Sequence, residues 1–115
     1  MPNAADLVPL KPLVFQVLLA LSDEPRHGWS LVREVQERDG VRVLPANFYR
    51  TLRAMLADGL IADAGRRQAE DERRRYFVLT PLGREAARLE ARRLQSLVAD
   101  TRTRRLLAAG GSRRR

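Results

Sequence analysis

Side chains able to carry out acid–base or nucleophilic chemistry are few in this chain of 115 residues. His27 is the sole histidine and cysteine is absent, so the four serines lack any other conventional base to activate them. Those serines are Ser22, Ser30, Ser96 and Ser112. The consecutive acidic residues 70–72 fall in a polar loop, a poor arrangement for acid–base or metal chemistry. We therefore expect no enzyme, no catalytic residue, no metal site and no cofactor.

Asparagine and arginine side chains at helical spacing offer a different chemistry, the reading of nucleic-acid bases. Apolar residues in segment 45–58 define one face of a helix: Phe48, Leu52, Met55 and Leu56. The other side carries Ala46, Asn47, Arg50 and Arg53, with Tyr49 between the two faces. A small Ala46 permits close approach to DNA, Asn47 can pair with adenine, and an arginine can pair with guanine. The alternative is an ordinary surface helix that carries the same residues.

A second group of arginines lies in the polar loop that follows. Within positions 66–75 there are five basic and three acidic residues, a net charge of +2. The arginines are Arg66, Arg67, Arg73, Arg74 and Arg75. Arginines at strand ends can contact phosphates or enter a narrow minor groove. The three acidic residues at the tip of the loop, 70–72, oppose this interpretation. The alternative is a solvated loop whose acidic and basic side chains neutralise one another.

The overall charge agrees with a polyanionic partner. The net charge is +8 and the isoelectric point is about 11.4, although 21 of the 22 basic residues are arginine, as a GC-rich genome would also produce. The absence of cysteine suits a cytosolic protein. No apolar run reaches the length of about 18–20 residues that a membrane span needs. We expect a cytoplasmic protein, associated with the nucleoid when bound.

The expected elements form a single small domain, in which a helix and the hairpin after it carry the two arginine groups. They are helices over about 12–21, 28–38 and 45–58, a short strand at 41–43, strands over 60–64 and 74–79, and a long helix from 81 to about 107. Three helices followed by a hairpin form a winged helix-turn-helix, whose third helix enters the major groove. The predicted fold is mainly α with a small β-hairpin. The predicted divisions are an N-terminal arm (1–9), the DNA-binding domain (10–80), a dimerisation helix (81–108) and a flexible basic tail (109–115).

The last helix suggests a dimer. Its apolar stripe consists of Leu82, Ala86, Leu89, Leu94, Leu97 and Val98. A helix of about 25 residues spans roughly 40 Å, too long to be buried on so small a domain. A second copy is the expected partner, and a two-fold axis would set two recognition helices about 34 Å apart. Polar residues near Asp100 could break the helix, and a helix folded back on its own domain is the alternative.

Four segments, in order, resemble the PadR-like family of transcriptional regulators. Segments 45–52 (PANFYRTL) and 58–61 (DGLI) resemble its recognition helix and first wing strand. Segment 75–83 (RYFVLTPLG) resembles the second wing strand and the start of the last helix, and 26–29 (RHGW) resembles the start of helix two. The resemblance covers residues 10–97, and the short chain is similar to the compact subfamily with a single C-terminal dimerisation helix.

The resemblance implies a homodimeric repressor on a roughly palindromic operator, with relief by a small apolar effector as a further option. It places DNA contacts on Asn47, Tyr49 and Arg50 and on wing arginines such as Arg74 and Arg75. His27 and Trp29 would contact phosphates, although a single tryptophan can equally serve core packing.

Two departures from the family pattern matter. Leu44 stands where the family often has serine, so the recognition helix lacks its usual N-cap oxygen. No tryptophan follows Trp29, so we do not expect the aromatic effector pocket of some compact members. A winged-helix module that binds an acidic protein partner is the alternative function, and nonspecific RNA binding is a weaker one. The operator, the regulated genes, the effector and the choice between repression and activation stay open.

Overall fold

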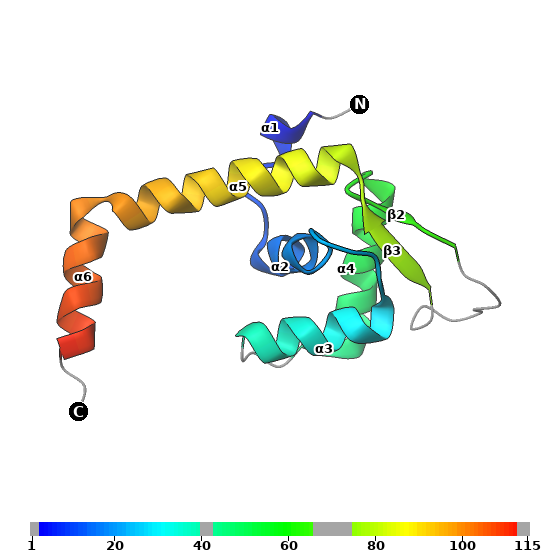
Figure 1. Ribbon diagram of the computed structural model, residues 1–115, viewed down its shortest axis with the longest axis horizontal. Helices are drawn as coiled ribbons and strands as arrows, with labels where there is room; N and C mark the ends of the chain where they lie inside the picture. Colours follow the sequence, from blue (N-terminus) through cyan, green and yellow to red (C-terminus); the bar gives the residue numbers. More distant parts are fainter. Residues whose placement is uncertain (1–2, 40–42, 66–74, 113–115) are drawn as a thin grey trace.

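The structure is a computed structural model that describes residues 3–39, 43–65 and 75–112. Its helices in these ranges are α1 (Ala4–Leu7), α2 (Pro12–Ala20), α3 (Gly28–Asp39), α4 (Pro45–Ala57), α5 (Pro81–Ala99) and α6 (Thr101–Ser112). Figure 1 shows α2, α3 and α4 grouped on one side of α5, with α1 on the other side. The principal extents are 52 × 35 × 22 Å, because α5 and α6 extend beyond this group. No helix in the described ranges is long and apolar enough to cross a membrane.

A three-stranded antiparallel sheet completes the domain. Its strands are β1 (Arg26–His27), β2 (Ile61–Asp63) and β3 (Tyr76–Leu79), in the order β1-β3-β2. The β2–β3 hairpin confirms the predicted wing, and Ile61 pairs with Leu79 across it. The strand predicted at 41–43 is not seen: Val43 lies outside any strand, and positions 41–42 lie outside the described residues. The third strand is instead β1, which is too short to show a periodic pattern.

The core joins the three head helices to the sheet; we call α2, α3, α4 and the sheet the head. The largest fully buried side chains are Phe48, Phe77, Leu18, Leu31, Leu52, Met55, Ile61, Val17 and Val35. Both halves of the predicted helix pattern in α4 are confirmed, because Phe48, Leu52 and Met55 are buried while its opposite side is exposed. The mainly α winged-helix fold predicted from the sequence is therefore correct.

Helix α5 begins where Thr80 and Pro81 predict. The Thr80 hydroxyl accepts the Gly83 N–H at 3.0 Å and donates to the Gly59 carbonyl at 2.6 Å, which ties the helix start to the turn after α4. Gly83 is required for this approach, since a Cβ there would lie 2.0 Å from the Leu60 carbonyl oxygen. The start of α5 is thus fixed to the head by the Thr80 hydroxyl and by the close approach of Gly83 to the Leu60 carbonyl.

The apolar stripe of α5 divides into two parts. Ala86 is fully buried, and Leu82 and Leu89 pack against the core of the same chain. Leu97 and Val98 are 51% and 55% exposed. The expectation that the whole stripe faces a second copy is therefore wrong for its first half, which is used by the head. The exposed portion begins after the half-buried Leu94.

The long C-terminal helix predicted to about residue 107 is two helices. Asp100 adopts an extended conformation (φ −62°, ψ 135°), which ends α5 at Ala99. Its carboxylate accepts the Arg102 N–H at 2.8 Å and so caps α6, and hydrogen bonds from Arg102 lower the pKa of this carboxyl. Helix α6 includes residues 109–112, which the sequence predicts as the start of a flexible tail. Residues 113–115 lie outside the described ranges.

The N-terminal arm is more ordered than the sequence predicts. Helix α1 packs on α5 and buries Ala4. Further along, the Leu10 N–H donates to Glu90 Oε1 at 3.1 Å, and Arg93 donates to both oxygens of Glu90 at 3.0 and 2.6 Å. Glu90 is 2% exposed, the one charged side chain buried among the described residues. Hydrogen bonds from Arg93 lower the pKa of Glu90, more than burial raises it. This carboxylate therefore fastens the arm to α5.

Replacing Glu90 by glutamine should lower the free energy of unfolding by about 1.5–3 kcal/mol, because a buried, charge-assisted contact is lost. Since the folded-state pKa is lowered, the contribution is complete above the ordinary glutamate pKa and is lost as pH falls through the folded value. Wild type should thus lose more stability than E90Q between about pH 6 and about pH 3. Urea unfolding at both pH values measures this.

Glu85→Gln is the matched control, because Glu85 and Arg88 have the same i, i+3 spacing and the same 2.6 Å contact at an exposed position. E85Q should change stability little. If E85Q and E90Q lowered the free energy of unfolding equally, the burial of Glu90 would not explain its contribution to stability.

Candidate nucleic-acid interface

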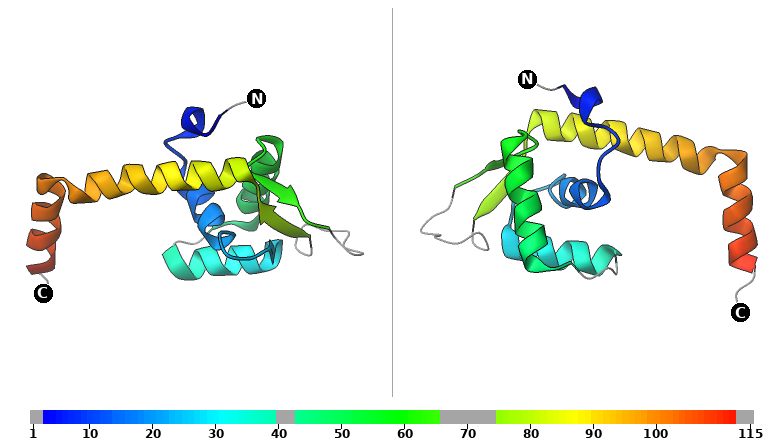
Figure 2. Two further views of the ribbon diagram at one scale, coloured as in Figure 1. Left: turned by 45° about the horizontal axis from the view of Figure 1, so that its top comes forward. Right: turned by 180° about the vertical axis from the view of Figure 1, so that it is seen from behind.

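Helix α4 presents the predicted base-reading residues to solvent. Ala46, Asn47, Arg50 and Arg53 are exposed, and Tyr49 is half-buried. The Tyr49 ring meets Phe48 edge to face, with centroids 5.8 Å apart, so the core fixes it from one side. In the right-hand view of Figure 2, α4 crosses the front of the domain. The four exposed side chains thus lie together on one surface.

The start of α4 is held without an N-cap side chain, as the sequence predicts. Leu44 makes no side-chain capping bond and is 59% exposed. Two other contacts hold this turn: Phe48 donates its N–H to the Leu44 carbonyl at 3.0 Å, and Val43 donates to Gln36 Oε1 at 3.1 Å. Gln36, which the sequence analysis does not single out, therefore positions the entry to α4 from α3.

The end of α4 is set by a glycine turn. Gly59 has a φ of +81°, the left-handed conformation that commonly ends helices. This turn lets Leu60 donate its N–H back to the Met55 carbonyl at 3.0 Å. The chain then passes directly into β2, so only a short turn separates α4 from the β2–β3 hairpin.

Asn47 and Arg50 are bonded to each other. Arg50 Nη1 donates to Asn47 Oδ1 at 2.9 Å. Because a guanidinium has five N–H donors, Arg50 keeps enough of them to pair with guanine while it holds this bond. Asn47 Oδ1 has two lone pairs, so it can accept from Arg50 and from the amino group of an adenine at the same time. The two residues consequently act as a coupled pair.

The base of the wing holds one of the five predicted wing arginines. Arg75 donates through Nη2 and Nε to Asp63 Oδ2 at 2.7 and 3.2 Å, across β2 and β3. Its guanidinium also lies 5.8 Å from the Phe77 ring centroid. Arg66, Arg67, Arg73 and Arg74, with the acidic residues 70–72, lie outside the described residues. Arg75 therefore braces the hairpin in this structure.

Ring side chains lie where α3 begins. His27 Nδ1 accepts the Ser30 N–H at 3.4 Å, so the imidazole caps α3, and its ring meets Tyr76 edge to face at 5.2 Å. Trp29 is 50% exposed, which rules out the core-packing alternative for this residue. Tyr76 is also exposed, and sequence reasoning missed it although Phe77 beside it is buried, as strand alternation dictates.

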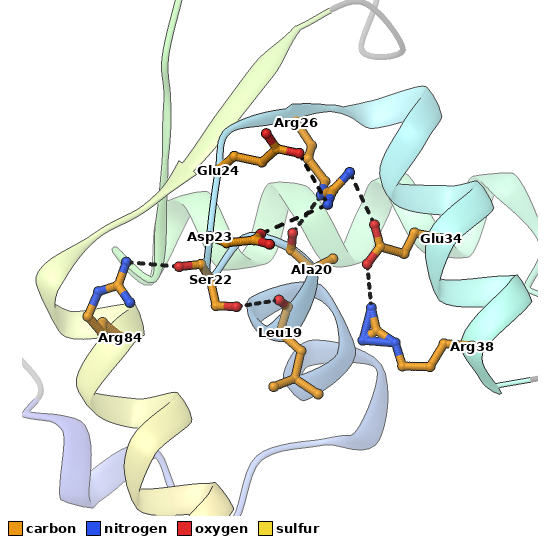
Figure 3. Close-up of polar contacts among 9 residues, drawn as sticks. All are labelled: Leu19, Ala20, Ser22, Asp23, Glu24, Arg26, Glu34, Arg38 and Arg84. Carbon is orange, nitrogen blue, oxygen red and sulfur yellow. Dashed lines mark hydrogen bonds and ion pairs between the residues drawn. The ribbon is translucent and has the colours of Figure 1, made fainter.

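Arg26 ties the head helices together, and Figure 3 shows its contacts. Its Nε donates to the Ala20 carbonyl at 2.7 Å, at the end of α2. Its other nitrogens pair with Glu34 of α3 at 3.2 Å and with Glu24 at 3.4 Å. Asp23 completes the set at 3.9 Å, so three carboxylates and a carbonyl surround this arginine and it serves the fold. Its place in the RHGW segment gave no sign of this role.

The described residues contain no group of three or more histidine, cysteine, aspartate or glutamate side chains that could hold a metal ion. The exposed side of α4 carries an asparagine and two arginines, and exposed rings lie at the start of α3 and on β3. The asparagine and the arginines can donate hydrogen bonds, and the arginines can pair with negative charge.

Comparison of the sequence with known proteins finds one matching family and two relatives. The family model described as "Transcriptional regulator PadR-like family" matches residues 17–89. The transcriptional regulator Rv3488 of Mycobacterium tuberculosis is 34% identical over 84 residues, covering 73% of this chain and 77% of that protein. A transposon protein of Streptomyces fradiae is 36% identical over 92 residues, and the match covers 73% of this chain but 26% of that protein. The chain thus spans about a quarter of this second relative.

Solved structures agree in fold. RosR of H. salinarum has a TM-score of 0.68 and 26% identity, with 90% of this chain and 92% of that chain covered. PadR of Bacillus subtilis, solved in complex with operator DNA, has a TM-score of 0.59 at 18% identity, with 70% of this chain and 46% of that chain covered. The second likeness concerns the fold alone.

The uncapped start of α4 yields a stability prediction. Leu44→Ser should raise the free energy of unfolding by about 0.5–2 kcal/mol, because a serine oxygen can accept an N–H in the first turn. Leu44 is largely exposed, so little apolar burial is lost. Leu44→Ala is the control that removes the same side chain without adding an oxygen. Chemical denaturation measures the free energy of unfolding of each variant. A serine variant no more stable than the alanine variant would show that the first turn of α4 gains nothing from an N-cap oxygen.

Proposed function

Because this chain belongs to the PadR-like family of transcriptional regulators, we propose that it binds duplex DNA sequence-specifically, as a homodimer, through α4 and the wing. The family consists of regulators and not of enzymes. The observation that carries the proposal is the outward face of α4, where Asn47 and Arg50 stand exposed beside small Ala46. An α-helix fits the major groove, and these side-chain types match adenine and guanine edges there.

The remaining contacts would fall on the DNA backbone. Arg53 and Tyr49 border the reading face of α4, and His27 and Trp29 lie at the start of α3. The proposed wing contacts are Arg66, Arg67, Arg73, Arg74 and Arg75, the last of which would have to leave Asp63. Phosphate contacts of this kind set the orientation of a protein on DNA without reading sequence.

A homodimer would use the exposed end of α5. Leu97 and Val98 form an apolar surface, next to the half-buried Leu94, that the head of the same chain does not cover. Burying it against a second copy removes apolar area from water. A two-fold arrangement would repeat the α4 surface about 34 Å away and favour a palindromic operator.

We further propose that the protein represses transcription and that a small apolar molecule relieves this repression. A cavity of about 280 Å³ lies between the N-terminal segment and α4, with Leu7, Leu10, Val14 and Met55 in its lining. Thr51 and Ala54 of α4 line it as well. An apolar occupant would therefore press on the helix proposed to read DNA. The proposed location is the cytoplasm, on the nucleoid when bound.

Selection of bound fragments from a pool of random duplexes tests the DNA-binding proposal. Wild type should enrich a palindrome, and Arg50→Ala should bind the enriched duplex about 1–3 kcal/mol more weakly if Arg50 reads a base. Since Arg50 and Asn47 are bonded, a double-mutant cycle with Asn47→Ala should be non-additive. Fluorescence anisotropy measures the affinities.

Exposed Glu37→Gln on α3 is a control that keeps the α4 surface intact. No enrichment by wild type, together with capture of an acidic protein, would support the protein-interaction alternative and overturn the DNA-binding proposal. An Arg50→Ala variant that binds the enriched duplex like wild type would show that the reading face has been misassigned.

Substitutions in the proposed dimer surface should lower the molecular mass of the protein in solution. L97E/V98E should shift the protein toward monomer, because two carboxylates cannot be buried in an apolar interface without a large desolvation cost. S96E/A99E adds the same charge at exposed positions on the side of α5 opposite Leu97 and Val98 and should leave the dimer intact. Sedimentation equilibrium distinguishes the two variants. A dimer that tolerates L97E/V98E would place the interface elsewhere.

A further inference from the structure

The positive charge of the chain is concentrated at its C-terminus. The first 100 residues contain 16 basic and 14 acidic side chains, a net charge of +2. The last 15 residues contain six arginines and no acidic residue. Most of the net charge of +8 therefore lies beyond Asp100, outside the winged-helix domain.

Helix α6 carries three of these arginines in the described part of the chain. Figures 1 and 2 show α6 turning at the end of α5 toward the side on which the head lies. Arg102 pairs with Asp100 at 3.0 Å, where it supports the helix start. Arg104 and Arg105 are exposed, and neither forms an ion pair with another residue that the structure describes. These two define what we call the arginine face of α6.

The arginine face borders the apolar side of the same helix. At about 100° per residue, Arg104 lies only about 60° from Leu107, whereas Arg105 lies about 100° from Leu106 and about 160° from Leu107. Those leucines are 74% and 62% exposed, and they suit contact with protein. If a second copy covered the leucines, Arg105 would stay open to a different partner, with Arg104 at the edge of the covered surface.

We propose that the arginine face of α6 binds the phosphate backbone of duplex DNA without regard to sequence. The inference rests on the proposed function, since α4 is what would bring DNA to the molecule. DNA is the favoured partner because the sequence-independent part of binding comes from cations placed against phosphates. The first 100 residues balance 16 basic side chains with 14 acidic ones, so the uncompensated positive charge of the chain lies mostly in its last 15 residues. Arginine also pairs well with phosphate, through two parallel N–H bonds.

The double variant R104Q/R105Q tests the proposal, because glutamine keeps the helix propensity and removes only the charges. Binding is measured by fluorescence anisotropy over a series of salt concentrations, on a random-sequence duplex and on the duplex enriched by selection. We expect both affinities to fall by the same factor, on the order of tenfold near physiological salt. The salt dependence should become shallower by about 1.8 per protomer, for two lost phosphate contacts.

The matched control R88Q/R92Q removes the same charge from exposed positions of α5, where Arg88 already pairs with Glu85. It should change affinity and salt dependence less. An equal loss in this control would overturn the proposal in favour of a general charge effect. An unchanged salt dependence in R104Q/R105Q would also overturn it.

Three further outcomes count against the proposal. Loss of affinity for the enriched duplex alone would mean that α6 reads sequence, and a weaker dimer in sedimentation would mean that the arginines serve protein assembly. Binding of polyglutamate as tight as that of duplex would point to an acidic protein partner. If wild type does not distinguish the enriched from the random duplex, the proposed function fails, while the salt dependence on random duplex still decides the role of α6.

Discussion

The one-sided burial of α4 is the constraint on which the rest of the structure depends. Phe48, Leu52 and Met55 are almost completely buried, and each contributes about 1.5–3 kcal/mol relative to an exposed side chain. Rotating the helix would expose these residues, so their packing fixes which residues point outward. The core of α2, α3 and the sheet, Gln36 at one end and the Gly59 turn at the other all hold this orientation. The outward surface of small and polar residues on α4 follows from it.

Helix α5 connects the head to the exposed apolar residues near its own end and to helix α6. Its first half belongs to the head through Ala86 and the backbone approach at Gly83, and Glu90 fastens the N-terminal segment to it. Its second half is uncovered, and Asp100 then redirects the chain into α6. Helix α5 thus carries the head near its start and an apolar surface near its end, at a spacing set by the rise of the helix, and the basic helix α6 follows after the turn at Asp100.

Local patterns in the sequence were enough to predict the winged-helix fold, the two faces of α4, the start of α5 at Thr80 and the missing cap at Leu44. They did not show β1, which has two residues and is defined only by its pairing with β3. Glu90 was missed because its burial and its contact with the Leu10 N–H, 80 residues away, exist only in the folded chain. The Arg75–Asp63 pair depends on hairpin register in the same way. Base contacts by Asn47 and Arg50, and phosphate contacts by the wing, remain predictions.

The central claim is that the exposed face of α4 recognises DNA bases. Nuclear magnetic resonance of the Asn47 side-chain amide and the Arg50 guanidinium, during titration with the enriched duplex and with a random duplex, tests it most directly. The account predicts that both signals shift with the enriched duplex, and much less with the random one at equal occupancy. Shifts confined to other surfaces, with both α4 signals unchanged at saturation, would contradict it.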